Sequence, residues 1–292
     1  MLTHPSSLKP VSLACLGSVL IGTSAIFVRM SELGPLSTGF YRMLFALPLL
    51  ALWMGWEKKE GLTPTLFPKK ELLALILAGS FFAADLALWN WSIDHTTIVN
   101  STLFNNTAAF FVPLILWVCF REKQPLKFII AAIICFIGCI FLVSDSVSVS
   151  FKNLWGDLVA LASGVTVALY LVALQRIRND VSTGLLMCWT GGFSMLFLAF
   201  FSYVFGESFW PLTFKDVISI LGQAILVHAL GQSLLAYSLG KIPASYAALI
   251  LFLAPVTAAI LGWAFYAETL SLIKILGMGL IMVSIIAARK RS

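Results

Sequence analysis

The sequence predicts an all-α integral membrane protein of ten transmembrane helices, and its composition, the spacing of its apolar stretches and the distribution of its basic residues support this. The 292-residue chain is 60% hydrophobic and only 11% charged. A soluble domain carries roughly 25% charged residues, because its surface meets water. The net charge of +6 does not indicate nucleic-acid binding, because the basic residues lie in short runs between apolar stretches. Most of the surface must therefore face lipid.

Ten apolar stretches each have about the 20 residues that cross a bilayer as a helix. We predict them at 11–30, 36–56, 72–93, 96–120, 126–144, 154–175, 183–206, 217–240, 242–267 and 272–288. The first one lacks a small-residue cleavage pattern, so we interpret it as a spanning helix rather than a signal peptide. The connections are too short for a soluble domain, and the chain is predicted to form one membrane domain.

The basic residues predict the orientation of these helices, because Lys and Arg collect in cytoplasmic loops. With a cytoplasmic N-terminus, the inside loops hold 14 of the 19 Lys and Arg residues, and Arg42 lies within a span. The outside loops hold only Arg29, Lys152, Lys215 and Lys274. This bias predicts a multi-pass protein of the cell membrane, in bacteria the inner membrane, with both termini cytoplasmic.

The chain also contains an internal repeat. A shift of 146 residues aligns 85–122 with 231–268, and it matches Ser92 with Ser238, Leu103 with Leu249, Trp117 with Trp263 and Glu122 with Glu268. The ten helices then divide into five-helix repeats at 1–145 and 146–292. Because five is odd, the second repeat must be inverted relative to the first, around a central cavity. Inverted repeats are typical of secondary transporters that work by alternating access.

Several short motifs resemble the EamA family of the drug/metabolite transporter superfamily. In the second half they are Ala244 to Leu249, Leu253-Ala254-Pro255-Val256 and Ala267-Glu268-Thr269-Leu270. In the first half they are Gly34-Pro35-Leu36, Tyr41-Arg42, Trp91-Ser92-Ile93, Asn100 to Leu103 and Arg121-Glu122-Lys123. The resemblance covers essentially the whole chain as two tandem units. It implies ten helices, cytoplasmic termini, a central cavity and, usually, export of metabolites or amino-acid-like solutes.

The sequence departs from the family pattern at two places. The proline expected in the fourth helix, at the position matching Pro255, is Ala109, and the nearest proline is Pro113. We therefore expect any kink in that helix to be displaced by one turn. Short relatives couple transport to protons through a glutamate in the first helix, but here the first carboxylate is Glu32, at the far end of that helix. A coupling proton is left open.

Ionisable groups at bilayer depth are costly and usually face a cavity or a partner. Arg42 and Asp85 are predicted to lie roughly 9–10 Å from the same end of their helices, at 1.5 Å per residue. An ion pair between them is one interpretation. The alternatives are that Arg42 extends to lipid headgroups and that Asp85 meets a hydroxyl group or water.

Further polar and aromatic side chains are candidates for a solute path. The fourth helix carries a polar stripe of Ser101, Thr102, Asn105 and Asn106, and the eighth carries His228 and Gln232 four residues apart. The simpler interpretation of each is a hydrogen bond between helices. Tyr41, Trp89 and Tyr246 are candidates for stacking on a solute, although packing is the ordinary role. The predicted cavity residues are Tyr41, Arg42, Asp85, Trp89, Thr102, Asn105, Asn106, His228, Gln232 and Tyr246.

Other classes of protein find little support. The three histidines are too scattered for a metal site, no HExxH motif is present, and no phosphate-binding loop indicates a nucleotide. We predict no catalytic residues, no metal and no cofactor, and the partners are a small-molecule solute and the lipid bilayer. The alternatives are an intramembrane enzyme and a membrane sensor or scaffold without transport. The solute, the direction of flux and the oligomeric state are left open.

Overall fold

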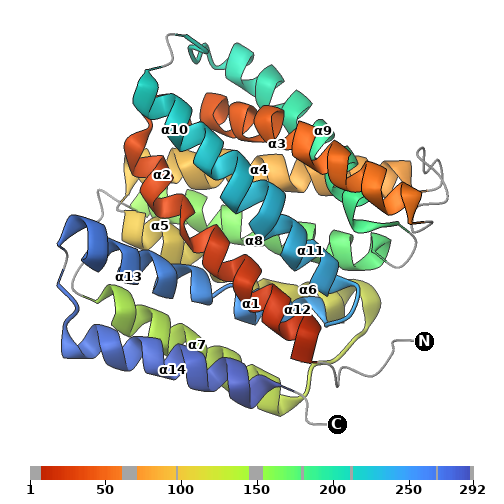
Figure 1. Ribbon diagram of the computed structural model, residues 1–292. Helices are drawn as coiled ribbons and strands as arrows, with labels where there is room; N and C mark the ends of the chain where they lie inside the picture. Colours follow the sequence, from red (N-terminus) through yellow and green to blue (C-terminus); the bar gives the residue numbers. More distant parts are fainter. Residues whose placement is uncertain are drawn as a thin grey trace.

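The computed structural model describes residues 8–60, 71–96, 98–144, 154–178, 181–210, 213–267 and 269–289. These residues are helical with short connections and contain no strand, and the helices pack side by side in a bundle (Figure 1). The predicted repeat boundary between residues 145 and 146, together with Glu268, lies outside the described residues. The predicted all-α class is confirmed.

Helices make up most of both halves of the described chain. The first half contains α1 (Leu8–Gly22), α2 (Ser24–Met30), α3 (Pro35–Lys59), α4 (Leu72–His95), α5 (Ile98–Asn105), α6 (Ala108–Phe120) and α7 (Leu126–Val143). The second half contains α8 (Leu154–Ile177), α9 (Thr183–Val204), α10 (Phe214–Gly222), the π-helix η2 (Gln223–Gln232), α11 (Ser233–Leu239), α12 (Ala244–Ile250), α13 (Leu253–Tyr266) and α14 (Leu272–Ala288).

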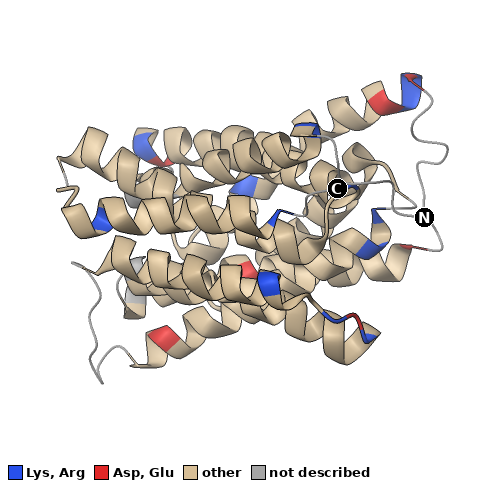
Figure 2. Ribbon diagram, turned by 90° about the horizontal axis from the view of Figure 1, so that it is seen from below, with Lys and Arg blue, Asp and Glu red and all other residues tan. Residues whose placement is uncertain are grey.

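Nine helical segments among the described residues have the length and hydropathy to cross a membrane, and α14 is a shorter apolar helix of 17 residues. Several of these segments contain more than one helical element, because the helix is interrupted while the chain continues in the same direction. They are α1 with α2, α5 with α6, α10 with η2 and α11, and α12 with α13. Charged residues gather toward the ends of the helices, and most of the ribbon between them carries none (Figure 2). This distribution matches a protein that spans a bilayer.

We call the end of the bundle where α1 begins and α14 ends the terminal face, and the opposite end the distal face. At the terminal face, the Ser238 hydroxyl at the end of α11 donates to the carbonyl of Pro10, at 2.9 Å. The Tyr246 hydroxyl, near the start of α12, donates to the carbonyl of Ile285 in α14, at 3.1 Å. The first and last described helices therefore have their outer ends on the same side of the bundle.

Contacts between the two halves follow a reciprocal pattern. Helix α4 packs on α8, and α1 packs on η2 and α11, so that the third span of each half contacts the first span of the other. Helices α3 and α9 pack together, as do α7 and α14, which run side by side along one edge of the bundle (Figure 1). The α7–α14 pair crosses where Gly138 and Gly277 meet: a Cβ on Gly138 would lie 2.8 Å from the Gly277 carbonyl oxygen.

The α3–α9 pair is joined by a carboxylate near each end, of which Glu57 is buried and Glu207 is partly exposed. At the terminal face, Glu57 of α3 accepts a hydrogen bond from the amide of Gly184 at the start of α9, at 2.7 Å. At the distal face, Glu207, just after α9, accepts from the amide of Ser37 at the start of α3, at 2.8 Å. Each carboxylate thus caps free N–H groups at the positive end of the other helix. Burial lowers the pKa of the neighbouring Arg178, while the charge of Glu57 acts in the opposite direction.

Two membrane segments are broken in the same way. Helices α5 and α12 begin 146 residues apart, at Ile98 and Ala244, and α6 and α13 end 146 residues apart, at Phe120 and Tyr266. The breaks lie at residues 106–107 and 251–252. Each segment is followed by a left-handed residue, Arg121 with φ 58° or Ala267 with φ 52°.

The two broken segments run in opposite directions. The Ser245 hydroxyl, at the start of α12, lies 3.0 Å from the Gln124 side-chain oxygen, just beyond the end of α6. The amide of Ala244 donates to the side chain of Gln175, near the end of α8, at 2.9 Å. One broken segment therefore ends at the face where the other begins.

The break in the second half occurs near Pro255, as its missing amide predicts. The carbonyl of Leu251 has no amide at position 255 to accept from, and it accepts instead from Ala254, at 2.9 Å. The expectation that the first half carries a displaced kink is wrong, because α6 continues through Pro113 and the break precedes Ala109. At this break, side chains bond to backbone carbonyl groups of the preceding turn. The Thr107 hydroxyl donates to the carbonyl of Phe104, at 2.5 Å, and the Asn106 side-chain amide donates to the carbonyl of Thr102, at 2.7 Å.

Candidate functional site

A cavity with charged and polar groups in a largely apolar wall lies between the two halves of the chain, beside both broken segments. It holds about 880 Å³ of empty space, counting the part that opens to the surroundings. Its lining comes from α1 to α6 in the first half and from α8, η2, α12 and α13 in the second. Seven of the ten residues predicted from the sequence line it: Arg42, Asp85, Trp89, Thr102, Asn105, Asn106 and Gln232.

Asp85 is held in place by an amide from the broken segment. The side-chain nitrogen of Asn105 donates to Oδ1 of Asp85, at 2.8 Å, and to the hydroxyl of Ser163 in α8, at 2.9 Å. Both hydrogens of this amide are therefore used. Ser163 in turn donates to the carbonyl of Ala160, at 2.7 Å. This chain of hydrogen bonds fixes one oxygen of a carboxylate that is only 8% exposed.

Helix α8 can supply Ser163 because it packs very closely on the break between α5 and α6. A Cβ on Gly164 would lie 2.8 Å from the carbonyl oxygen of Phe104 and 2.6 Å from the hydroxyl of Thr107. Helix α1 packs equally closely on the broken segment of the second half, since a Cβ on Gly22 of α1 would lie 2.5 Å from the carbonyl oxygen of Ala254. Small residues are thus required where an unbroken helix meets a broken one.

Arg42 projects a buried cation into the same cavity. Its side chain is 4% exposed, and its Nε–H has no hydrogen-bond partner among the described residues. The guanidinium carbon lies 5.8 Å from the centre of the Phe82 ring, a contact that favours a cation. The described residues include no ion pair between Arg42 and Asp85, so the direct pairing that their equal depth suggested is not formed in this structure.

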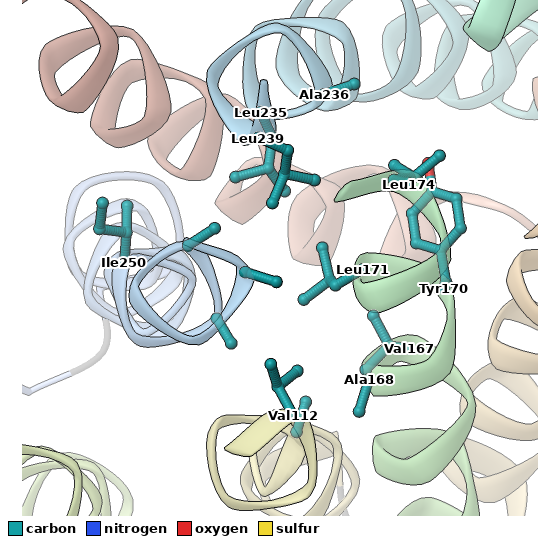
Figure 3. Packing of buried hydrophobic residues seen from close by; sticks show 14 of the residues in the cluster. Val112, Val167, Ala168, Tyr170, Leu171, Leu174, Leu235, Ala236, Leu239 and Ile250 are labelled. Carbon is teal, nitrogen blue, oxygen red and sulfur yellow. The ribbon is translucent and has the colours of Figure 1, made fainter. Parts of the chain in front are cut away.

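An apolar plug fills the bundle between the cavity and the terminal face. Figure 3 shows Val112 of α6, Leu171 of α8 and Leu235 and Leu239 of α11 pointing toward one another. These side chains are at most 2% exposed. These closely packed apolar side chains separate the cavity from the terminal face.

Three of the predicted residues lie away from the cavity. The Tyr41 hydroxyl donates to the carbonyl of Phe209 at the distal face, at 3.0 Å, and Tyr246 bonds Ile285 at the terminal face. His228 is stacked on Phe82 with ring centroids 5.4 Å apart, and neither ring nitrogen has a hydrogen-bond partner in the described part of the chain. The structure places His228 one layer behind the cavity wall.

Sequence reasoning missed three residues of the site: Ser24, Phe82 and Ser163. Ser24 and Phe82 line the cavity, and Ser163 positions Asn105. A serine or phenylalanine in an apolar helix has the appearance of ordinary packing, so no local signal marks either. Only for Ser163 was a clue present, because it is next to Gly164 in the small-residue spacing Ala160, Gly164, Ala168.

The described residues contain no cluster of three or more His, Cys, Asp or Glu side chains that could hold a metal ion. The chemistry that this cavity offers is recognition by a cation, a carboxylate, amides and aromatic faces. A bundle of membrane-spanning helices around such a cavity defines a multi-pass membrane protein that can accommodate a small polar solute.

Comparison with known proteins identifies the group to which this bundle belongs. Residues 8–144 and 154–289 each match the EamA-like transporter family. The chain therefore belongs to the EamA-like transporter family, within the drug/metabolite transporter superfamily, and the resemblance seen in its motifs is confirmed.

Individual relatives are consistent with this assignment. An uncharacterized transporter of Archaeoglobus fulgidus is 28% identical over 251 residues, covering 84% of each chain. The threonine/homoserine exporter RhtA of Escherichia coli K12 is 26% identical over 259 residues, covering 85% of this chain and 81% of the relative. A solved crystal structure has the same fold, with a TM-score of 0.81, 14% identity and coverage of 97% of both chains.

Proposed function

We propose that this protein is a secondary transporter that exports small metabolites or amino-acid-like solutes by alternating access of two inverted five-helix repeats. The observation that carries the proposal is a cavity that is lined by both halves, has charged and polar groups in its wall, and is separated from the terminal face by an apolar plug. A solute in this cavity is shielded from the terminal face. Moving it across requires a second arrangement in which the plug opens and the distal side closes.

The packing of the helices supports inverted repeats at 1–145 and 146–292, with ten membrane crossings. The α5–α6 and α12–α13 segments are antiparallel and similarly broken, and the α4–α8 contact is matched by the contact of α1 with η2 and α11. An exchange of roles between two such halves would open the opposite face of the cavity. Export is favoured by similarity to one relative that is an exporter of threonine and homoserine.

The proposed location is the cell membrane, with the terminal face in the cytoplasm. The lysine and arginine bias of the predicted inside loops supports this orientation. In the present arrangement the cavity is then closed to the cytoplasm. Reporter fusions at the two ends of the chain test the topology: we expect both to report the cytoplasm, and opposite sides would rule out an even number of crossings.

Flux into proteoliposomes tests the transport activity. The purified protein should move at least one solute from a panel of amino acids, including threonine and homoserine, and small metabolites, with or without a pH gradient to test a coupling proton. We expect Asn106→Ala and Gln232→Ala to reduce the flux several-fold with normal expression, because both side chains line the cavity. Ser12→Ala, on the exposed surface of α1, is the matched control. Turnover of a substrate by the protein, without flux of any solute, would instead support an intramembrane enzyme.

A further inference from the structure

The wall of the cavity carries one cationic and one carboxylate side chain that are not in direct contact as an ion pair. Arg42 and Asp85 both line it, and no ion pair joins them. Both side chains are more than nine-tenths buried. Each is a charge removed from water, and such groups are stable only when paired or hydrogen-bonded. The site as it stands is therefore incomplete on both sides.

The missing partner of Arg42 is an anion. Its guanidinium carries five N–H donors and no acceptor, and Nε–H is buried without a partner. The contact with the Phe82 ring supplies no hydrogen-bond acceptor for Nε–H. A planar guanidinium binds a carboxylate through two parallel hydrogen bonds, which is the strongest arrangement available to it. A carboxylate of the solute fits this position.

The missing partner of Asp85 is a cation or a donor. Asn105 occupies Oδ1 and is itself fixed by Ser163. The hydrogen bond from Asn105 reaches Oδ1 and not Oδ2, and Asp85 belongs to the cavity wall. An ionised carboxylate oxygen is an acceptor only, and an ammonium group would satisfy it.

We propose that Arg42 and Asp85 bind the two charges of an α-amino acid zwitterion, with Arg42 holding its carboxylate and Asp85 its ammonium group. The two charges of such a solute are attached to one carbon, which suits a cavity that presents both countercharges from neighbouring helices. The remaining wall, with Phe82, Leu86 and Val227, faces the solute side chain. This inference rests on the proposed transport function and narrows its substrate class.

The test compares solutes that lack one charge at a time. Wild-type proteoliposomes take up L-threonine or L-leucine in competition with the corresponding amide, which lacks the carboxylate, and the corresponding 2-hydroxy acid, which lacks the ammonium group. The same measurements follow for Arg42→Gln and Asp85→Asn. Lys127→Gln and Glu60→Gln, at exposed positions outside the cavity, are matched controls for loss of one charge.

In the wild type, we expect the amide and the hydroxy acid to compete about 10–100-fold less well than the amino acid, as hydrogen bonds to charged groups imply. Arg42→Gln should remove the disadvantage of the amide but keep that of the hydroxy acid. Asp85→Asn should remove the disadvantage of the hydroxy acid but keep that of the amide. Arg42→Lys keeps the cation and should keep the preference for a carboxylate. Thermal unfolding of Arg42→Gln should not be earlier than that of the wild type, since the variant removes an unpaired buried charge.

The result that overturns the inference is a loss of affinity in Arg42→Gln or Asp85→Asn that is equal for all three solutes. Transport of other solutes with no transport of amino acids would also overturn it, and would leave the proposed function intact. A wild-type protein that moves no solute in any panel would refute the proposed function itself.

Discussion

The two broken segments have the same layout but different causes. In the second half, Pro255 removes an amide and the carbonyl of Leu251 turns to Ala254. In the first half, the hydroxyl of Thr107 and the amide of Asn106 bond the carbonyls of Phe104 and Thr102, and no proline is involved. We infer from this difference that the packing of the neighbouring helices requires a break at this position in both halves. Different local interactions accommodate the break in each half.

The largest effect should come from filling the space where an unbroken helix meets a break. Gly164→Val places a side chain against the carbonyl of Phe104 and the hydroxyl of Thr107. Overpacking of this kind costs about 1–3 kcal/mol or more, so the thermal unfolding temperature in detergent should fall clearly. Gly22→Val should have a similar effect on the second break.

Gly279→Val is the control for this change, because a Cβ at Gly279 meets nothing within 4 Å. An unchanged unfolding temperature in Gly164→Val would mean that α8 does not depend on close contact with the break.

A smaller loss is expected when the side-chain bond at the first break is removed. Thr107→Val keeps the shape but deletes the donor to the carbonyl of Phe104. Hydrogen bonds between or within membrane helices contribute about 0.6 kcal/mol on average, and we expect a destabilisation of about 1 kcal/mol by chemical denaturation. Thr166→Val, within the unbroken α8, makes the same chemical change at an ordinary position. Equal effects at the two sites would argue that the Thr107 hydroxyl has no special role in the break.

The smallest effect should come from the residue that appears most important in the sequence. Pro255 is the third residue of α13, within the first turn, where proline is tolerated, and the Leu251 carbonyl that it leaves free already accepts from the amide of Ala254. Pro255→Ala should therefore change the free energy of unfolding by less than about 1 kcal/mol. A loss of several kcal/mol would show that proline itself, rather than the packing around Gly22, specifies the second break.

Much of the architecture could be predicted from the chain, because it depends on local hydropathy. The predicted stretch 126–144 corresponds to Leu126–Val143, and 183–206 corresponds to Thr183–Val204. Seven of the ten candidate residues line the cavity, because polar groups in apolar helices have few other places to lie.

The remaining features depend on contacts between segments far apart in the sequence. Thr107 has no feature that distinguishes a helix-breaking hydroxyl from one facing a solute. Likewise, equal depth placed Arg42 and Asp85 at the same level without showing that Asn105 and Ser163 would hold the carboxylate. Tyr41 and Tyr246 resembled stacking residues, although each hydroxyl bonds a backbone carbonyl near an end of the bundle.

The carboxylates of Glu57 and Glu207 have a consequence for how the bundle can move. They join α3 to α9 at opposite ends, and these two helices come from different halves of the chain. Sliding of one helix along the other would lengthen the contact at one end and compress it at the other. Shear between them is therefore resisted. The pair, which contains one helix from each half, should move as one rigid body, so the moving bodies do not coincide with the two repeats.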